Sequence, residues 1–430
     1  MKRIAFTRST EIQNAAPYLP NLQAFFENRG IHAKLFYSRG DCRKVDFPGE
    51  TEKVDESISA RGLAERLIRW NSDGVISLAI PDENAVRDAL VREILASHEI
   101  PVIAHPVLAA QVLSNKWDTK LALAQFNLKT PTAHLLDGDL LNQRNISFPV
   151  YRELVLRNAQ EIGYPVLTKP LWDSLGNGIG FYHDEDELKS FLDVPYNGNV
   201  VLEKFSAGTL CSVEVMGTDG QYVFQPILWK GLTELKSTLF FNEVRHSVID
   251  RHAERIFSKV KDHIIEFCNH FRISGVIEVE MIFYEDDYYV IEINPRVSGT
   301  TVLSAASSGI NTFEALTHMV LGSWPEFTSQ IVEHGNSEKF SLQFPYIDGA
   351  NLDSLGEDIS LIKINDFHRN GTVYRNAIVS GRYEKLSELG QGIESGFRVN
   401  EEVSEKIRRL SHASKLARAA NVEREQRKHS

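Results

Sequence analysis

The residues best suited to chemistry in this sequence lie in the acidic stretch 275–296, GVIEVEMIFYEDDYYVIEINPR. Two runs rich in β-branched and aromatic residues, Val276–Tyr284 and Tyr288–Ile293, flank an acidic turn. Such runs predict a β-hairpin, here with the three-residue loop 285–287. Because side chains alternate between faces, one face of the hairpin is expected to be core. The apolar residues predicted on that face are Ile277, Val279, Met281, Phe283, Tyr289, Ile291 and Ile293.

Four polar side chains share the other face of this predicted hairpin. A loop centred on Asp286 places Glu280 opposite Glu292, and Glu278 opposite Asn294. Facing carboxylates destabilise a strand pair unless solvent or a cation lies between them. Solvated glutamates are the alternative, but the strand ends in Asn, Pro and Arg, which favours a binding site. We therefore expect Glu280, Glu292 and Asn294 to bind Mg²⁺ or Mn²⁺, with substrate phosphates completing the coordination shell.

Lysines and a glycine-rich turn lie upstream of the hairpin. A helix is predicted to open near Lys116, with Lys120 one turn later on the same face. Lys169 ends a short strand before the turn 173–180, which reads DSLGNGIG. A lysine beside such a turn suits phosphate oxygens, because glycines let backbone N–H groups approach closely. Taken alone, the helical lysines would be solvated and the glycines would fit an ordinary hairpin turn.

In this order, residues 114–322 resemble the ATP-grasp superfamily, whose metal-binding end carries Glu on one strand and Glu-x-Asn-x-Arg on the next. The resemblance implies that ATP and Mg²⁺ (or Mn²⁺) are cofactors. It also implies that Arg296 and Lys116 clamp the phosphoryl group during catalysis. The ATP-binding residues that it implies are Lys116, Lys169, Ser174, Gly176, Gly178, Glu203, Lys204, Phe205 and Glu214.

The resemblance assigns separate parts of the nucleotide to these residues. Lys169 serves the α- and β-phosphates, and residues 174–180 form a mobile flap over them. Glu203 accepts a hydrogen bond from the adenine amino group, and backbone groups near Lys204 and Phe205 bind the ring edge. The chain has Leu210 where many members have a ribose-binding Glu, which leaves ribose recognition open.

Composition excludes several classes of protein. The chain has 430 residues, enough for two or three subdomains, and 47 Lys and Arg against 58 Asp and Glu. The net charge of −11 argues against nucleic acid as the main partner. The three cysteines are scattered, so neither a disulfide framework nor a zinc site is predicted. With no signal peptide or long apolar span evident, we expect a cytoplasmic protein without a membrane partner.

The fold class predicted is α/β and α+β in three parts. Residues 1–113 alternate strands and helices, which predicts an open α/β domain, with residues 41–55 as a surface loop. An ATP-grasp fold of two α+β subdomains clamping ATP is expected over 114–322, with a lid at about 130–206. Residues 323–430 are predicted as an α+β extension with strands Lys339–Pro345 and Thr372–Ser380. This extension would shape the substrate pocket or form a homodimer contact.

The function predicted is that of an ATP-dependent carboxylate–amine ligase, similar to L-amino acid and dipeptide ligases. A small carboxylic acid would form an acyl phosphate, and an amine would then displace phosphate to give an amide. Two alternatives stay open at this point. One is biotin-carboxylase-like carboxylation, although no biotin-carrier Met-Lys-Met motif occurs. The other is a non-catalytic nucleotide-binding regulator.

Overall fold

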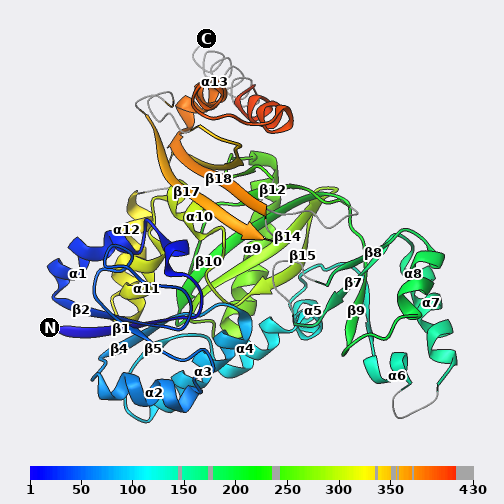
Figure 1. Ribbon diagram of the computed structural model, residues 1–430, viewed down its shortest axis with the longest axis horizontal. Coiled ribbons are helices and arrows are strands. Elements are labelled where there is room, and N and C mark those ends of the chain that lie inside the picture. The colour runs from blue at the N-terminus through cyan, green and yellow to red at the C-terminus, as the bar shows by residue number, and fades with distance from the viewer. Residues whose placement is uncertain are drawn as a thin grey trace.

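The computed structural model describes residues 1–143, 148–172, 178–234, 243–334, 338–349, 355, 358–369 and 372–412. Its N-terminal part is a five-stranded parallel sheet with helices packed on it (Figure 1), as predicted. The strands, in the order β3-β2-β1-β4-β5, are Glu50–Lys53, Ile31–Tyr37, Lys2–Arg8, Gly74–Leu78 and Val102–Ile103. The helices are α1 Gln23–Arg29, α2 Ala60–Arg69 and α3 Asp82–Ala96.

One strand of this sheet was expected to be loop. The prediction of a surface loop at 41–55 is wrong for β3, whose sequence ETEK lacks an apolar pattern. This strand lies at the edge of the sheet, where charged side chains are tolerated. Lys34 on β2 pairs with Glu52 across 2.9 Å, so ion pairs accompany the strand ladder here.

The first strand, β1, lies in the middle of the sheet, and later strands are added on both sides of it. The strands β2 and β3 extend it on one side, and β4 and β5 extend it on the other. The carboxyl ends of β1 and β4 therefore flank a topological switch point, where open α/β sheets commonly bind ligands.

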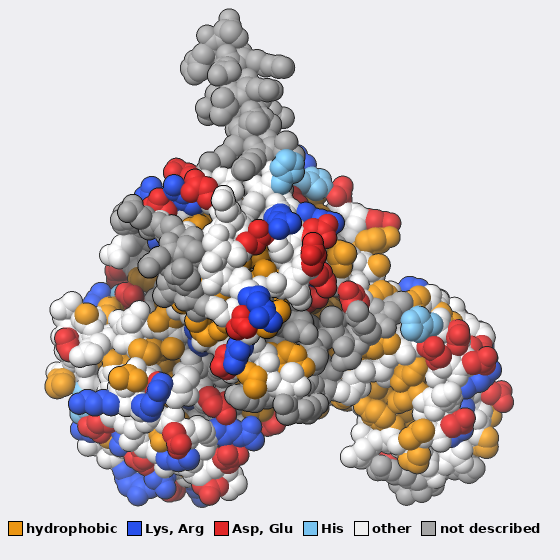
Figure 2. Space-filling view, turned by 45° about the horizontal axis from the view of Figure 1, so that its top comes forward, with side chains coloured by type: hydrophobic (Ala, Val, Ile, Leu, Met, Phe, Trp, Pro, Cys, Tyr) orange, Lys and Arg blue, Asp and Glu red, His pale blue; other side chains and the backbone are white. Residues whose placement is uncertain are grey.

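Residues 133–204 form a separate lobe, which stands away from the body in Figures 1 and 2. Its antiparallel sheet has the order β6-β9-β7-β8, with the strands Ala133–Leu136, Val200–Lys204, Val166–Pro170 and Gly180–Tyr182. Its helices are α6 Gly138–Asn142, α7 Val150–Ile162 and α8 Glu185–Leu192. The lobe has its own core, in which α7 and α8 bury Val155, Ala159 and Leu188 against Leu202.

A second, larger sheet fills the body of the molecule. Its order is β15-β14-β10-β12-β13-β16-β18-β17, with β11 paired to β10. The strands are β10 Thr209–Thr218, β11 Gln221–Phe224, β12 Leu228–Leu232, β13 Arg245–His246, β14 Gly275–Tyr284, β15 Asp287–Asn294, β16 Lys339–Pro345, β17 Ile359–Arg369 and β18 Thr372–Arg382. The predicted strands at 339–345 and 372–380 are present, whereas β17 was not predicted despite its alternating start ISLIKI.

Helices cover this sheet and connect it to the N-terminal part. They are α4 Val107–Ser114, α5 Lys116–Gln125, α9 Arg251–His270, α10 Thr301–Ser308, α11 Thr312–Val320, α12 Trp324–His334 and α13 Leu386–Gly396. A further helix begins at 401 and is described as far as 412. Within the described ranges, no helix combines the length and the apolar character needed to cross a membrane.

The β14–β15 hairpin has the predicted pairing of Glu280 with Glu292, but its turn is shorter than predicted and one strand contains a bulge. The turn has two residues, Glu285 and Asp286, with φ of 48° and 58°, and not three as expected. A β-bulge then inserts Ile291, so that Glu280 pairs with Glu292 as predicted. Between turn and bulge the side chains are shifted by one residue. Tyr288 and Val290 are therefore buried where Tyr289 and Ile291 were expected.

Candidate functional site

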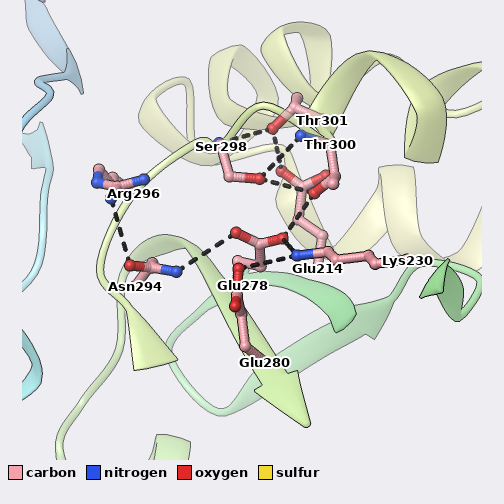
Figure 3. A network of polar contacts seen from close by, with 9 residues as sticks. All are labelled: Glu214, Lys230, Glu278, Glu280, Asn294, Arg296, Ser298, Thr300 and Thr301. Carbon is pink, nitrogen blue, oxygen red and sulfur yellow. Dashed lines mark hydrogen bonds and ion pairs between the residues drawn. The ribbon is translucent and has the colours of Figure 1, made fainter. Parts of the chain in front are cut away.

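Three glutamates and a buried lysine form the centre of the candidate site, and Figure 3 shows Glu278, Glu280 and Lys230 among them. Glu278 and Glu280 project from one face of β14, and Glu292 lies opposite Glu280 on β15. Lys230 Nζ on β12 lies 2.9 Å from Glu278 Oε1 and 2.8 Å from Glu280 Oε1. One ammonium group therefore bridges two carboxylates at the base of the site.

Glu278 and Glu280 have different electrostatic environments. Burial favours the neutral form of Glu278, but the Lys230 ammonium and the Thr300 hydroxyl outweigh it and lower its pKa. Burial raises the pKa of Glu280, and the Glu278 and Glu292 carboxylates add to that rise. Glu278 is 4% exposed and Glu280 is 23% exposed, so Glu280 is the one of the two that faces the open site.

Asn294 and Arg296 continue from the hairpin toward the N-terminal sheet. Asn294 donates from Nδ2 to Glu278 Oε2 across 3.4 Å, and Arg296 Nη2 donates to Asn294 Oδ1 across 3.3 Å. Arg296 Nε also donates to Asp82 Oδ1 across 2.6 Å. Burial opposes the charge on Arg296, but Asp82 outweighs it and raises the pKa of the guanidinium. The predicted catalytic arginine is thus held between the hairpin and the start of α3.

Lys116 lies near the same carboxylates at the start of α5. Asn115 caps this helix by accepting from the N–H groups of Trp117 and Asp118. Lys116 Nζ is 3.7 Å from Glu292 Oε2, and its backbone N–H donates to Leu171 O across 3.1 Å. The structure therefore brings Lys116 together with Glu292, beside the strand that leads into the glycine-rich turn.

A second cationic cluster lies between α5 and the lobe. Glu203 on β9 is buried, with Lys169 Nζ 2.6 Å from Oε1 and Lys120 Nζ 2.7 Å from Oε2. Lys120, which alone would be read as solvated, is instead 6% exposed and belongs to this cluster. Burial opposes ionisation of Glu203, but the two lysines outweigh it and lower the pKa of the carboxyl. The two carboxylate oxygens of Glu203 thus orient two ammonium groups. The predicted hydrogen bond from the adenine amino group to Glu203 is not tested by this arrangement and stays a prediction.

The other residues assigned to ATP have distinct surroundings. The N–H groups of Lys204 and Phe205 donate to Thr132 O and Pro165 O, so an adenine contact there would need other groups. The Lys204 side chain turns away to Gly163 O, 2.6 Å from Nζ. Gly178 has φ of 76°, and a Cβ atom there would lie 2.8 Å from Pro170 Cγ, which explains the glycine. Ser174 and Gly176 lie outside the described residues.

Glu214 lies on β10, directly opposite Glu278 of β14, and is buried. It is 1% exposed and accepts a hydrogen bond from Thr301 Oγ1 across 2.9 Å. Burial raises its pKa to about 8, so the carboxyl is neutral at pH 7. A neutral, buried carboxyl group supports the packing of α10 on β10, and its assignment to the ATP site stays a prediction.

The chemistry of the predicted metal ligands fits a hard divalent cation. Glu280, Glu292 and Asn294 offer carboxylate and amide oxygens, the donors that Mg²⁺ prefers. Among the residues that the structure describes, no three His, Cys, Asp or Glu side chains already converge on a metal position. Lys230 Nζ donates a hydrogen bond to Glu280 Oε1, so one of the two oxygens of this carboxylate already has a partner. Binding a cation at Glu280 would therefore require this ammonium group to move or share the carboxylate.

Several residues of the site were missed by sequence reasoning. Lys230 is a single lysine within the apolar start of β12, LWKGL, and that isolated charge was its only local signal. Asp82 follows Pro81 at the start of α3, about 200 residues before its partner Arg296. Glu278 was expected on the polar face, but its contacts with Lys230 and Thr300 were not predicted.

Known proteins share parts of this sequence and its fold. Residues 113–300 match the family model of an ATP-grasp domain. The carbamoyl-phosphate synthase of Methanobrevibacter smithii is 25% identical over 366 residues, which cover 82% of this chain and 90% of that protein. The carbamoyl phosphate synthase large chain of Clostridium perfringens is 24% identical over 307 residues, 68% of this chain but 26% of the relative.

Solved structures of low sequence identity share the fold of nearly the whole chain. The L-amino acid ligase of Bacillus licheniformis superposes with a TM-score of 0.65 at 17% identity, over 93% of this chain and 98% of its own. The biotin carboxylase domain of the 2-oxoglutarate carboxylase of Hydrogenobacter thermophilus, solved with MgADP and bicarbonate, gives 0.66 at 13% identity, over 93% and 90%. ATP-grasp enzymes use ATP and Mg²⁺, the cofactors expected from the sequence. Residues 113–300 of this chain therefore form an ATP-grasp domain, and the chain is related to ATP-grasp ligases.

Proposed function

We propose that this chain is an ATP-dependent ligase that joins a small carboxylic acid to an amine through an acyl phosphate. The observation that carries the proposal is the pairing of Glu280 with Glu292, followed on β15 by Asn294 and Arg296. Carboxylate oxygens for a cation thus lie within reach of a guanidinium group that could clamp a phosphoryl group. The resemblance in fold to an L-amino acid ligase supports an amide product.

The chemistry proposed follows from the need to activate a carboxylate, whose oxygen is too basic to leave on attack by an amine. A carboxylate oxygen attacks the γ-phosphorus of ATP, the bond to the bridging oxygen breaks, and ADP leaves. The amine nitrogen then attacks the acyl carbon, loses a proton, and phosphate departs with the acyl oxygen. Negative charge on the phosphoryl oxygens would be stabilised by Arg296 and Lys116, together with Mg²⁺ when it is bound.

The two clusters have separate roles in this proposal. Lys169 and Lys120, both oriented by Glu203, would bind phosphate oxygens on the side of the lobe. Glu280, Glu292 and Asn294 would hold Mg²⁺ on the side of the body. Small-molecule acid and amine substrates in the cytoplasm are the proposed partners, and a homodimer is the assembly proposed.

The test is a product analysis with the full chain, ATP and Mg²⁺. Amino acids and small carboxylates are supplied singly and in pairs, and nucleotides are separated by chromatography. We expect ADP and phosphate in equal amounts for an accepted pair, and an acyl hydroxamate when hydroxylamine replaces the amine. AMP and pyrophosphate as products would refute the acyl phosphate. ADP formation that depends on bicarbonate would support carboxylation instead.

A further inference from the structure

A buried arginine lies at the switch point of the N-terminal sheet. Arg8 ends β1 and is 3% exposed, and within the described part of the chain its guanidinium donates to backbone carbonyls alone. Nε and Nη2 lie 3.4 Å from Glu11 O, and Nη1 lies 3.5 Å from Leu78 O at the end of β4. These distances are at the long limit for N–H···O hydrogen bonds, so the donors are poorly satisfied.

A second cationic side chain, Lys363, lies near Arg8 and belongs to β17, the edge strand of the larger sheet. Lys363 on β17 donates from Nζ to Gln13 O across 2.7 Å and to Asn14 O across 3.1 Å. Burial lowers its pKa to about 8, and the charge of Arg8 adds to that effect. Burial likewise lowers the pKa of Arg8 to about 10, although Glu11 acts in the opposite direction.

Among the described residues, the buried Arg8 and the half-buried Lys363 have no carboxylate in direct contact, unlike Arg296 and Lys230, and Glu11 acts on Arg8 only as a nearby charge. Arg296 has Asp82 at 2.6 Å, and Lys230 has two glutamates. Within the described ranges, neither Arg8 nor Lys363 has a carboxylate oxygen within 4.0 Å, and both bind backbone carbonyls. Neighbouring like charges removed from water are unfavourable unless a counter-charge is bound. Their position outside the carboxyl ends of β1 and β4 is where an open α/β sheet binds ligands.

We propose that Arg8 and Lys363 form an anion subsite that binds a carboxylate or phosphate group of the acid substrate, remote from the carboxylate that is activated. This inference rests on the proposed ligase function. The chain segment from Leu78 to Asp82 connects Arg8 to Arg296, which clamps the phosphoryl group. The Cα atoms of Leu78 and Asp82 are at most roughly 14 Å apart, so Arg8 and Arg296 contact the two ends of one short segment of chain. The substrate class is therefore an acid with a second anionic group.

The test measures binding to the full chain without nucleotide, by calorimetry at constant ionic strength. The probes are glutarate, inorganic phosphate and glutaramide, the uncharged analogue of glutarate. We expect glutarate or phosphate to bind and glutaramide not to bind. Tighter binding of glutarate identifies a carboxylate ligand, and tighter binding of phosphate identifies a phosphate ligand.

Variants separate this subsite from the lysines of the ATP site. Lys363→Met should weaken anion binding about tenfold or more, the value of one charge-assisted hydrogen bond, while Lys363→Arg should largely retain it. Lys339→Met removes an exposed lysine on β16 and is the matched control. Arg8→Gln is a second variant, whose folding is checked by circular dichroism. Unchanged affinity in Lys363→Met, or equal binding of glutaramide, would overturn the proposal.

The design also separates this proposal from that of the ligase. Anion binding is measured without ATP, so it remains informative if no ADP is formed with any acid. Conversely, a chain that forms ADP with monocarboxylic acids and is insensitive to Lys363→Met would keep the ligase proposal and overturn the subsite.

Discussion

Arg296 Nε lies 2.6 Å from Asp82 Oδ1, and this contact joins the end of the β14–β15 hairpin to the first turn of α3. Both side chains are nearly buried, at 12% and 11% exposed. The N-terminal domain thereby fixes the position of an arginine that belongs to the ATP-grasp domain. Its charge and geometry depend on an acid from a part of the chain outside residues 113–300.

The first prediction concerns this pair. Asp82→Asn removes the negative charge but keeps an acceptor, so the fold should survive while Arg296 loses its fixed orientation. We expect kcat to fall at least about tenfold, corresponding to roughly 1.4 kcal/mol of lost transition-state stabilisation. The adjacent, exposed Glu83 supplies the control, because Glu83→Gln should retain the wild-type kcat. A wild-type rate in Asp82→Asn would show that Arg296 does not need this partner.

The second prediction concerns the metal ligands. Glu292→Ala removes an oxygen ligand from a side chain that is 24% exposed, so turnover should be abolished while the melting temperature changes little. Asp262→Ala, on the exposed face of α9, should leave both quantities unchanged. Wild-type turnover of Glu292→Ala at saturating Mg²⁺ would move the metal site elsewhere.

The third prediction concerns the lysine that bridges two carboxylates. Lys230→Met should destabilise the fold by about 3–5 kcal/mol, because it leaves Glu278 buried without its cation. Mg²⁺ should raise the melting temperature of this variant more than that of the wild type, because the freed carboxylates can bind it. Thermal unfolding with and without Mg²⁺ measures both effects.

The exposed ion pair between Lys129 and Asp287 is the control for Lys230. Because Lys129 is 58% exposed and its charge is screened by water, Lys129→Met should destabilise the fold far less than Lys230→Met. Equal losses of stability in the two variants would contradict a buried charge cluster at Lys230.

The fourth prediction is a pH dependence from Glu214. Its pKa is about 8 in the folded chain and near 4.5 when unfolded, so the folded state binds the additional proton between these values. This stabilising contribution is complete below pH 4.5 and is lost as the pH rises through 8. Glu214→Gln keeps the neutral group at every pH. Urea unfolding from pH 5 to 8.5 should therefore show a smaller loss of stability in Glu214→Gln than in the wild type, and parallel curves would disprove it.

Sequence reasoning predicted the polar face of the β14–β15 hairpin because alternation and pairing are local properties, while its role in metal binding stays a prediction. Glu280 faces Glu292 as predicted, although the turn is one residue shorter than expected. The bulge at Ile291 restores the register beyond it. A bulge of this kind leaves no clear signal in one sequence, so the shifted burial of Tyr288 and Val290 could not be predicted.

The ion-pair partners of the site residues could not be predicted from the sequence, because these contacts form only in the tertiary structure. Lys230 and Lys120 reach their carboxylates, and Asp82 reaches the Arg296 guanidinium, through contacts between strands and helices that are far apart in the sequence. Each looks like an ordinary surface charge until the sheets are assembled. Chain order predicted the open α/β domain and the ATP-grasp fold, whereas the ion pairs that connect them depend on tertiary packing.

One continuous sheet runs from β15 of the β14–β15 hairpin to β17, which carries Lys363, whereas the lobe of residues 133–204 shares no described strand with it. The hairpin and β17 are thus connected through backbone hydrogen bonds from strand to strand, although the short strand β13 joins the two halves by only three residue pairs among the described residues. The lobe is covalently attached only through the segments 126–132 and 205–208. Any rotation of the lobe relative to the body would therefore have to be taken up by these two segments, the first of which is attached to β15 by the hydrogen bond from Val290 N–H to Lys129 O.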